Sequence, residues 1–251
     1  MPRYFMRLSF RGAPFHGWQR QPGAISVQQV LEESLGRILR LEPVAVTGAG
    51  RTDAGVNASM MIAHFDLPFH LPDPPATVRA LNSIVGRDIA VQSIVQVADD
   101  AHARFDATKR TYHYYCVTCK DPFTYPLTWK APANLDFEAM NRAATLLLDT
   151  RDFSSFAKLH SDAKTNICDV RRAEWIPTPG GTGMTFVISA DRFLRNMVRA
   201  VVGTLVEVGR GKMTVEGFRK VIEAHDRCSA GTSMPPQALF LAEVKYPYPL
   251  W

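Results

Sequence analysis

The pattern of apolar and polar residues predicts a strand, a helix and then a mixture of both in the first part of the chain. Residues 4–11 alternate, with Met6, Leu8 and Phe10 on one face, which is typical of a half-buried strand. Ser26 is a suitable N-cap for a helix whose apolar residues recur at helical spacing as far as Leu39. The other elements predicted here are strands over 44–47, 60–65 and 89–97 and a helix over 75–83.

The second part of the chain repeats this mixture. A β-rich run over 111–118 opens it, and two more strands are predicted over 168–175 and 184–189. Asp136 is the expected cap of a helix that bears Phe137, Met140, Leu147 and Leu148, and another helix begins at Thr214. Between them, the periodicity predicts a long helix over 192–205 with Arg192, Arg195 and Arg199 along one face.

Neither part shows the regular strand–helix alternation of a parallel sheet. We therefore expect an α+β fold made of two similar halves, each with a mainly antiparallel sheet flanked by helices. The expected halves are residues 1–105, which contain the loop 48–57, and residues 106–251. No low-complexity linker separates them, so they are expected to pack as one body with the active cleft between them.

Composition narrows the class of protein. The chain has 251 residues, of which 46% are hydrophobic and 21% charged, and these values are those of an ordinary globular protein. Its net charge of +5 suits an anionic partner such as nucleic acid. The first residues hold no apolar run typical of a signal peptide, and no stretch is long enough for a membrane span.

Cysteine usage indicates a reducing compartment, with the cytoplasm as the expected location. Four cysteines are too few and too scattered to staple a chain of this length. Cys116 and Cys119 form a C-x-x-C motif, but no second pair of Cys or His stands at zinc spacing. We therefore predict a structural role for this pair and expect no metal site.

The glycine-rich loop 48–57, GAGRTDAGVN, carries the candidate chemistry. It places the carboxylate of Asp53 two residues after the guanidinium of Arg51, and its glycines let backbone and substrate approach closely. One reading is catalysis by Asp53. The other is a tight turn in which Asp53 only caps the residues that follow it.

Several other site classes do not match the residues. A dinucleotide loop G-x-G-x-x-G requires Gly at position 53, and a P-loop requires Lys before Ser or Thr. The H-x-E and P-C-x-x-C motifs of zinc deaminases and the G-x-S-x-G motif of hydrolases do not occur. An RNA methyltransferase is disfavoured because no glycine-rich cofactor loop fits.

Seven segments together resemble the TruA family of tRNA pseudouridine synthases, in the order in which that family has them. The signature loop GAGRTDAGVNA is the most specific of them. The others are HGWQRQP with SVQQVLEESL, ALNSIVGRDIAV, HARFDATKRTYHYY, DFSSF, FLRNMVRAVVGTLVEVG and PPQALFLAEVKYP. The resemblance thus extends over nearly the whole chain.

The resemblance implies isomerisation of uridine to pseudouridine at positions 38, 39 and 40 of the tRNA anticodon arm. It also implies a homodimer that uses neither a metal nor an organic cofactor. Residue by residue, it assigns the catalytic aspartate to Asp53 and the arginine that displaces the base to Arg51. The tyrosine that packs on the base falls on Tyr112, and the arginine that pairs with the aspartate on Arg199.

The residues leave two questions open. An ionised Asp53 is compatible with attack at the anomeric carbon, with attack at ring carbon 6 and with glycal formation. The alternative function is a catalytically silent RNA-binding protein of the same fold.

Asn57 departs from the family, which usually has His there, although Asn offers RNA both a donor and an acceptor. The basic residues expected to contact phosphates are Arg7, Arg11, Arg20, Lys109, Arg110, Arg192 and Arg195.

Overall fold

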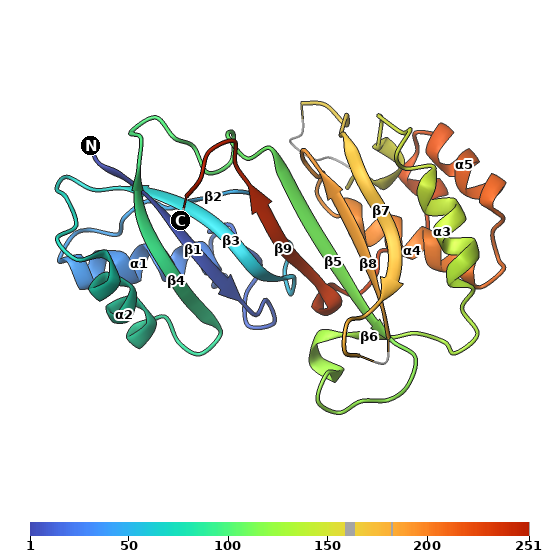
Figure 1. Cartoon of the computed structure of the whole chain (residues 1–251), viewed down its shortest axis with the longest axis horizontal. Coiled ribbons are helices and arrows are strands. Elements are labelled where there is room, and N and C mark those ends of the chain that lie inside the picture. Colours follow the sequence, from blue (N-terminus) through green and yellow to red (C-terminus); the bar gives the residue numbers. More distant parts are fainter. Residues whose placement is uncertain (159–163, 182, 251) are drawn as a thin grey trace. The chain divides into compact units, whose positions relative to one another are not determined.

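The structure is a computed structural model that describes residues 1–158, 164–181 and 183–250, and it forms two compact units (Figure 1). Unit 1 comprises Met1–Thr108 and Leu241–Trp251, and unit 2 comprises Lys109–Phe240. The sequence placed the end of the chain in the half 106–251, whereas in the structure it belongs to unit 1. Most of strand β9 (Leu239–Lys245) lies in this last segment, and the strand is hydrogen-bonded to strand β3 of unit 1.

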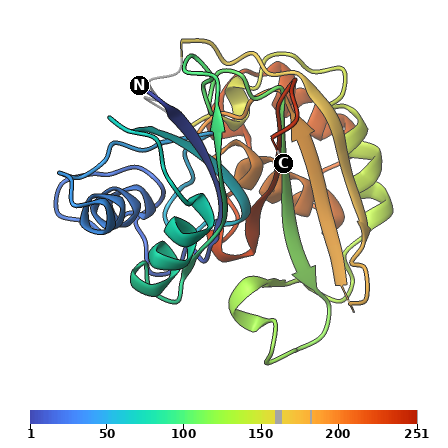
Figure 2. The ribbon, with the colours of Figure 1, turned by 60° about the vertical axis from the view of Figure 1, so that its left-hand side comes forward.

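Unit 1 is built around strand β1 (Arg3–Phe10). It pairs antiparallel with β3 (Asn57–Asp66) on one side and with β4 (Ile89–Val97) on the other. The two-residue strand β2 (Thr47–Gly48) adds to β3. Helices α1 (Val27–Leu39) and α2 (Pro74–Ile84) contact each other and lie on the same side of these strands (Figure 2).

Unit 2 has the strand order β5, β8 and β7, all antiparallel. These strands are β5 (Lys109–Val117), β8 (Gly183–Ala190) and β7 (Val170–Pro177). The short β6 (Trp129–Lys130) runs parallel to β5. Helix α3 (Phe137–Thr145) packs on β7 and also contacts α4 (Met197–Gly209) and α5 (Val215–Glu223). Four 3-10 helices complete the elements of the described residues: Tyr125–Leu127, Ser154–Phe156, Arg227–Ser229 and Pro236–Ala238.

The architecture confirms the predicted α+β class with mainly antiparallel strands. Several boundaries agree closely with the sequence pattern. The Ser26 hydroxyl accepts a hydrogen bond from Gln29 N at 3.2 Å, as expected of the N-cap of α1. Asp136 and Thr214 cap α3 and α5 in the same way. Local capping chemistry was therefore a reliable guide to where helices begin.

The prediction of a helix over 192–205 was wrong at its start. Helix α4 begins at Met197, because Asn196 adopts a left-handed conformation with φ of 66°. Arg192 and Arg195 consequently lie before the helix and do not share a helical face with Arg199. Apolar periodicity continued through this segment, and nothing in the pattern marked the reversal at Asn196.

Two further boundaries differ from the prediction. Of the strand expected over 44–47, only Thr47 pairs, because the amides of Val44 and Val46 donate to the backbone and side chain of Glu32 in α1. The α3 helix ends at Thr145, before the two leucines assigned to it. The segment PPQALFLAEVKYP, which contains β9, contributed to the family resemblance, but no strand was predicted there.

A buried histidine in β3 predicts an acid-sensitive fold. His64 is 7% exposed, and its Nδ1 accepts a hydrogen bond from Ala103 N at 3.1 Å. Burial lowers the pKa of His64 to about 4, and the charges of Arg3 and His102 act in the same direction against weaker opposition from Asp66 and Asp106. Above pH 6.5 the residue is neutral in both the folded and the unfolded chain. Below that pH the unfolded chain binds the proton first, which favours unfolding.

We therefore expect the free energy of unfolding to fall between pH 6.5 and about pH 4 by on the order of 2 to 3 kcal/mol through His64 alone. The measurement is urea unfolding of the wild type and of His64→Gln at several pH values. Glutamine retains an acceptor but does not titrate, so the variant should lose less stability over this range. Parallel pH profiles of the two proteins would contradict the assignment.

Candidate active site

The loop 48–57 lies between β2 and β3 in unit 1. Arg51 is exposed, Asp53 is half-buried and Thr52 between them is buried. The Asp53 carbonyl accepts a hydrogen bond from Val56 N at 3.1 Å, and this bond closes a turn over Ala54 and Gly55. Asp53 is therefore the first residue of a hydrogen-bonded turn, and Arg51 lies two residues before it in the exposed part of the loop.

Trp18, in the segment HGWQRQP, contacts this loop at two positions. Its backbone N–H donates to the Thr52 carbonyl at 3.1 Å. Its indole lies so close to Gly48 that a Cβ there would come within 2.5 Å of the ring. The position of the tryptophan therefore requires glycine at position 48. The resemblance motif around Trp18 thus has a physical role in fixing the backbone next to Asp53.

A buried carboxylate, Glu32, holds the same segment to helix α1. It is 8% exposed and accepts hydrogen bonds from Gln28 Nε2 at 3.0 Å and from Arg20 Nη1 at 3.2 Å. The Gln28 side chain in turn accepts the Arg20 N–H at 2.9 Å. Because buried charge is costly unless it is paired, this network fixes residues 18–20 against α1. The same network engages the guanidinium of Arg20, which was one of the cations expected to contact phosphate.

Asn57, which stands where the family usually has His, makes a structural hydrogen bond inside unit 1. It is 1% exposed, and its Oδ1 accepts a hydrogen bond from Gly12 N at 2.8 Å. The side chain therefore joins the start of β3 to the end of β1 inside unit 1. The departure from the usual His therefore lies at a buried position at the end of the candidate loop.

Tyr112 lies on β5 in unit 2, opposite Ile188 of β8. It is 9% exposed, and its ring meets Phe193 edge to face, with centroids 5.0 Å apart. Tyr114, on the same face of the strand, is fully buried and donates its hydroxyl hydrogen to the Pro235 carbonyl at 3.2 Å. Tyr114 therefore belongs to the core, and Tyr112 is the one of the two at its margin.

Arg199 is half-buried in the first turn of α4. Its Nε donates to the Met234 carbonyl at 2.6 Å, and its own carbonyl accepts the Met234 N–H at 3.1 Å. Asn196 and Arg227 both donate to the Ser233 hydroxyl in the same segment. The Nε side of the Arg199 guanidinium is thus anchored to Met234, and this contact fixes where the guanidinium lies within unit 2.

The predicted site residues fall into two pairs. Arg51 and Asp53 lie in the loop 48–57 of unit 1, while Tyr112 and Arg199 lie in unit 2. Sequence reasoning missed Phe193, which contacts the Tyr112 ring, because the segment before Met197 was interpreted as helix. Of the cations expected to contact phosphate, Arg110 is buried and donates to the Asp191 carbonyl at 2.6 Å. Arg110 is therefore a structural residue.

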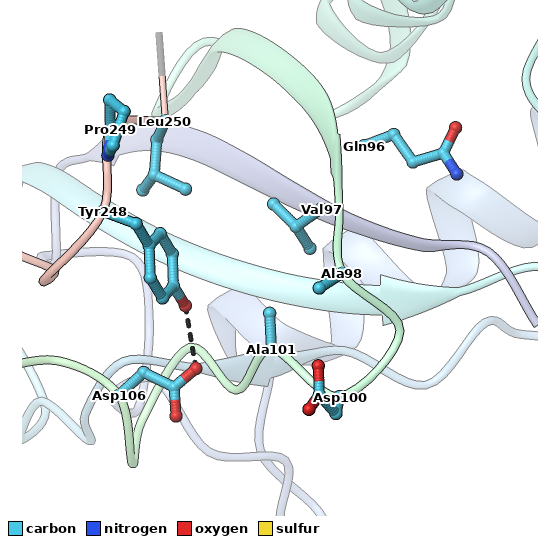
Figure 3. A pocket seen from close by; sticks show the side chains of 9 residues that line it. All are labelled: Gln96, Val97, Ala98, Asp100, Ala101, Asp106, Tyr248, Pro249 and Leu250. Carbon is cyan, nitrogen blue, oxygen red and sulfur yellow. Dashed lines mark hydrogen bonds between the residues drawn. The ribbon is translucent and has the colours of Figure 1, made fainter.

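Other features of the chain contribute no chemistry to this loop. Burial raises the pKa of the Cys116 thiol to about 11, so it stays protonated at neutral pH. No group of three or more His, Cys, Asp or Glu residues suited to a metal occurs in the described part of the chain. Across the same residues, no helix is long and apolar enough to cross a membrane. A cavity of about 400 Å³ in unit 1 lies at the end of β4 and residues 248–250, and none of the four predicted site residues lines it (Figure 3).

Comparison with known proteins shows the family to which the chain belongs. A family model described as tRNA pseudouridine synthase matches residues 143–247. The chain is 56% identical to tRNA pseudouridine synthase A of Parabacteroides distasonis over 251 residues, which is 100% of this chain and 98% of the relative. It is 52% identical to the protein of that name from Porphyromonas gingivalis, with 100% of both chains covered. It is 38% identical to the one from Cereibacter sphaeroides, with 98% of both covered. The chain therefore belongs to the family of tRNA pseudouridine synthases, which are isomerases.

Proposed function

We propose that this protein isomerises uridine to pseudouridine at positions 38, 39 and 40 of the tRNA anticodon arm. The observation that carries the proposal is the presentation of Asp53 on a turn braced by Trp18, in a chain of this family. A half-buried carboxylate on a fixed turn suits a reaction in which one group must meet the sugar or the base of an extruded nucleotide. No redox step is needed, and we propose neither metal nor organic cofactor.

Arg51 and Tyr112 each have a proposed role toward the flipped base. Arg51, exposed beside Asp53, takes the place of the base in the stack. Tyr112, held edge to face by Phe193, packs on the extruded base, and such stacking is worth about 1–3 kcal/mol. If replacement of Arg51 or Tyr112 by Ala left turnover of the same uridines unchanged, that residue would leave the proposal.

Arg199 is proposed to stabilise the ionised form of Asp53. We expect Arg199→Ala to lower turnover by about 10- to 100-fold, because the opposite charge that favours the carboxylate is gone. The matched variant Arg199→Lys keeps the charge and should retain part of the activity. Tritium release from tRNA labelled at carbon 5 of uridine measures turnover, with tRNA affinity measured separately. Equal losses in Ala and Lys variants would point to the Met234 anchor instead of the charge.

The proposed partners are tRNA, through the anticodon arm, and a second copy of the chain. The net charge of +5 supports an anionic substrate, and the expected setting is the cytoplasm. The alternative function remains a catalytically silent RNA-binding protein of this fold. It would bind the anticodon arm without forming pseudouridine.

The decisive experiment is chemical mapping of pseudouridine in unmodified tRNA transcripts after incubation with the purified protein. The proposal expects carbodiimide-dependent stops at positions 38, 39 and 40 where these are uridine. Stops elsewhere in the tRNA would retain the family activity and overturn the proposed positions. Tight binding of the transcript with no stops at any position would favour the silent alternative.

A further inference from the structure

A series of aromatic rings leads from the core of unit 1 to its surface. The Phe5 and His64 ring centroids are 6.2 Å apart, those of His64 and His102 4.6 Å, and those of His102 and Phe105 4.2 Å. Phe5 at one end is fully buried, whereas Phe105 at the other is 74% exposed. We call these four residues the aromatic column. Its outer end is a large apolar ring that is mostly exposed to solvent.

The backbone around the outer ring is fixed by hydrogen bonds. His102 Nδ1 accepts the N–H groups of Arg104 and Phe105 at 3.1 and 3.2 Å. Asp106 Oδ2 accepts the His102 N–H at 2.7 Å and the Tyr248 hydroxyl at 2.8 Å (Figure 3). Much of the entropy of ordering the turn has therefore already been lost before any partner binds, which favours binding at Phe105.

The chemistry of the exposed end selects the partner. The Arg104 guanidinium lies over the Phe105 ring, 5.7 Å from its centroid. An aromatic face next to a guanidinium suits a partner that offers a flat ring together with negative charge. An unpaired nucleotide has both, whereas a second copy of this chain would bring a net charge of +5 against a cation.

We propose that Phe105 is a stacking platform for an unpaired base of the tRNA substrate, with the Arg104 guanidinium over its ring as the cationic part of the same site. This inference rests on the proposed function for the identity of the RNA. It adds a contact outside the loop 48–57 and assigns a purpose to the motif HARFD. Because Phe105 is mostly exposed, the platform contributes to RNA affinity without being needed for the fold.

The test compares Phe105→Ala, Phe105→Trp and the control Phe123→Ala. Phe123 is 92% exposed in unit 2 and matches Phe105 in size and exposure. The measurements are Kd for an unmodified tRNA transcript by filter binding, kcat and KM for pseudouridine formation, and thermal unfolding. We expect Phe105→Ala to raise Kd and KM about 10- to 100-fold, while Phe105→Trp and Phe123→Ala stay within about threefold of the wild type. All three should unfold at the wild-type temperature.

The outcomes separate this proposal from the proposed function. Wild-type Kd in Phe105→Ala, or an equal loss in Phe123→Ala, would overturn the platform and leave pseudouridine formation untouched. A wild type that binds tRNA but forms no pseudouridine would overturn the proposed function. The platform would still be tested by comparing the Kd of Phe105→Ala with that of the wild type. If Phe105→Ala changed sedimentation of the protein instead of its tRNA affinity, the ring would be a contact between copies and the proposal would fail.

Discussion

Replacing Asp53 by Asn is expected to lower pseudouridine formation by on the order of 10³-fold or more while tRNA affinity changes little. Asparagine has nearly the same shape but no charge, and all three first steps open to this enzyme require an ionised carboxylate. The turn itself should survive, because the bond that closes it uses the Asp53 carbonyl and Val56 N–H. Tritium release from tRNA labelled at carbon 5 of uridine measures the rate, and filter binding measures affinity.

The same variant decides between the two readings of the loop. If Asp53 were only a cap for the turn, Asp53→Asn would keep most of the activity, since asparagine caps turns as well as aspartate does. Thr52→Ser is a matched control, because it changes the neighbouring buried residue and keeps its hydroxyl. Loss of turnover in Asp53→Asn alone, with thermal unfolding unchanged in both variants, would assign the chemistry to the carboxylate.

Local signals in the sequence predicted much of the fold. Ser26, Asp136 and Thr214 marked helix starts because a capping side chain satisfies a backbone amide three residues ahead. Alternation predicted β4 with the bounds the structure has. The start of α4 was missed because the left-handed turn at Asn196 depends on a hydrogen bond to Ser233, far along the chain. Strand β9 as a whole was missed for a similar reason, since its pairing with β3 is set by tertiary contacts.

The candidate site divides in the same way. The loop 48–57 was visible in the sequence because its residue types are themselves unusual. Its support was not visible. It depends on segments that only folding brings together. Trp18 lies on Gly48, Glu32 is buried, and Asn57 accepts a hydrogen bond from Gly12. Sequence therefore predicted the chemical groups of the loop better than the residues that position them.

The anchoring of Arg199 depends on a close contact between α4 and the segment after Ala230. A Cβ on Gly203 would lie 1.8 Å from the Thr232 carbonyl oxygen, which is backbone and cannot rotate away. Gly231 N donates to the Thr204 hydroxyl at 2.9 Å across the same contact. The helix and the segment that carries Met234 can therefore approach this closely only with glycine at position 203.

Gly203→Ala should accordingly destabilise the protein by about 2–4 kcal/mol, from overpacking and from weakened hydrogen bonds across the contact. In an ordinary helix interior the same change would stabilise by about 1 kcal/mol. Gly217→Ala in α5 is the matched control, because the three atoms nearest to its new Cβ belong to the side chains of Met213 and Thr214, and no backbone atom is among them. Urea unfolding measures both. Because the displaced segment holds Arg199, turnover in Gly203→Ala should fall even where the protein is fully folded. A Gly203→Ala protein as stable as Gly217→Ala would show that α4 can move away from Thr232 at no cost, and would remove the reason to link that glycine to the position of Arg199.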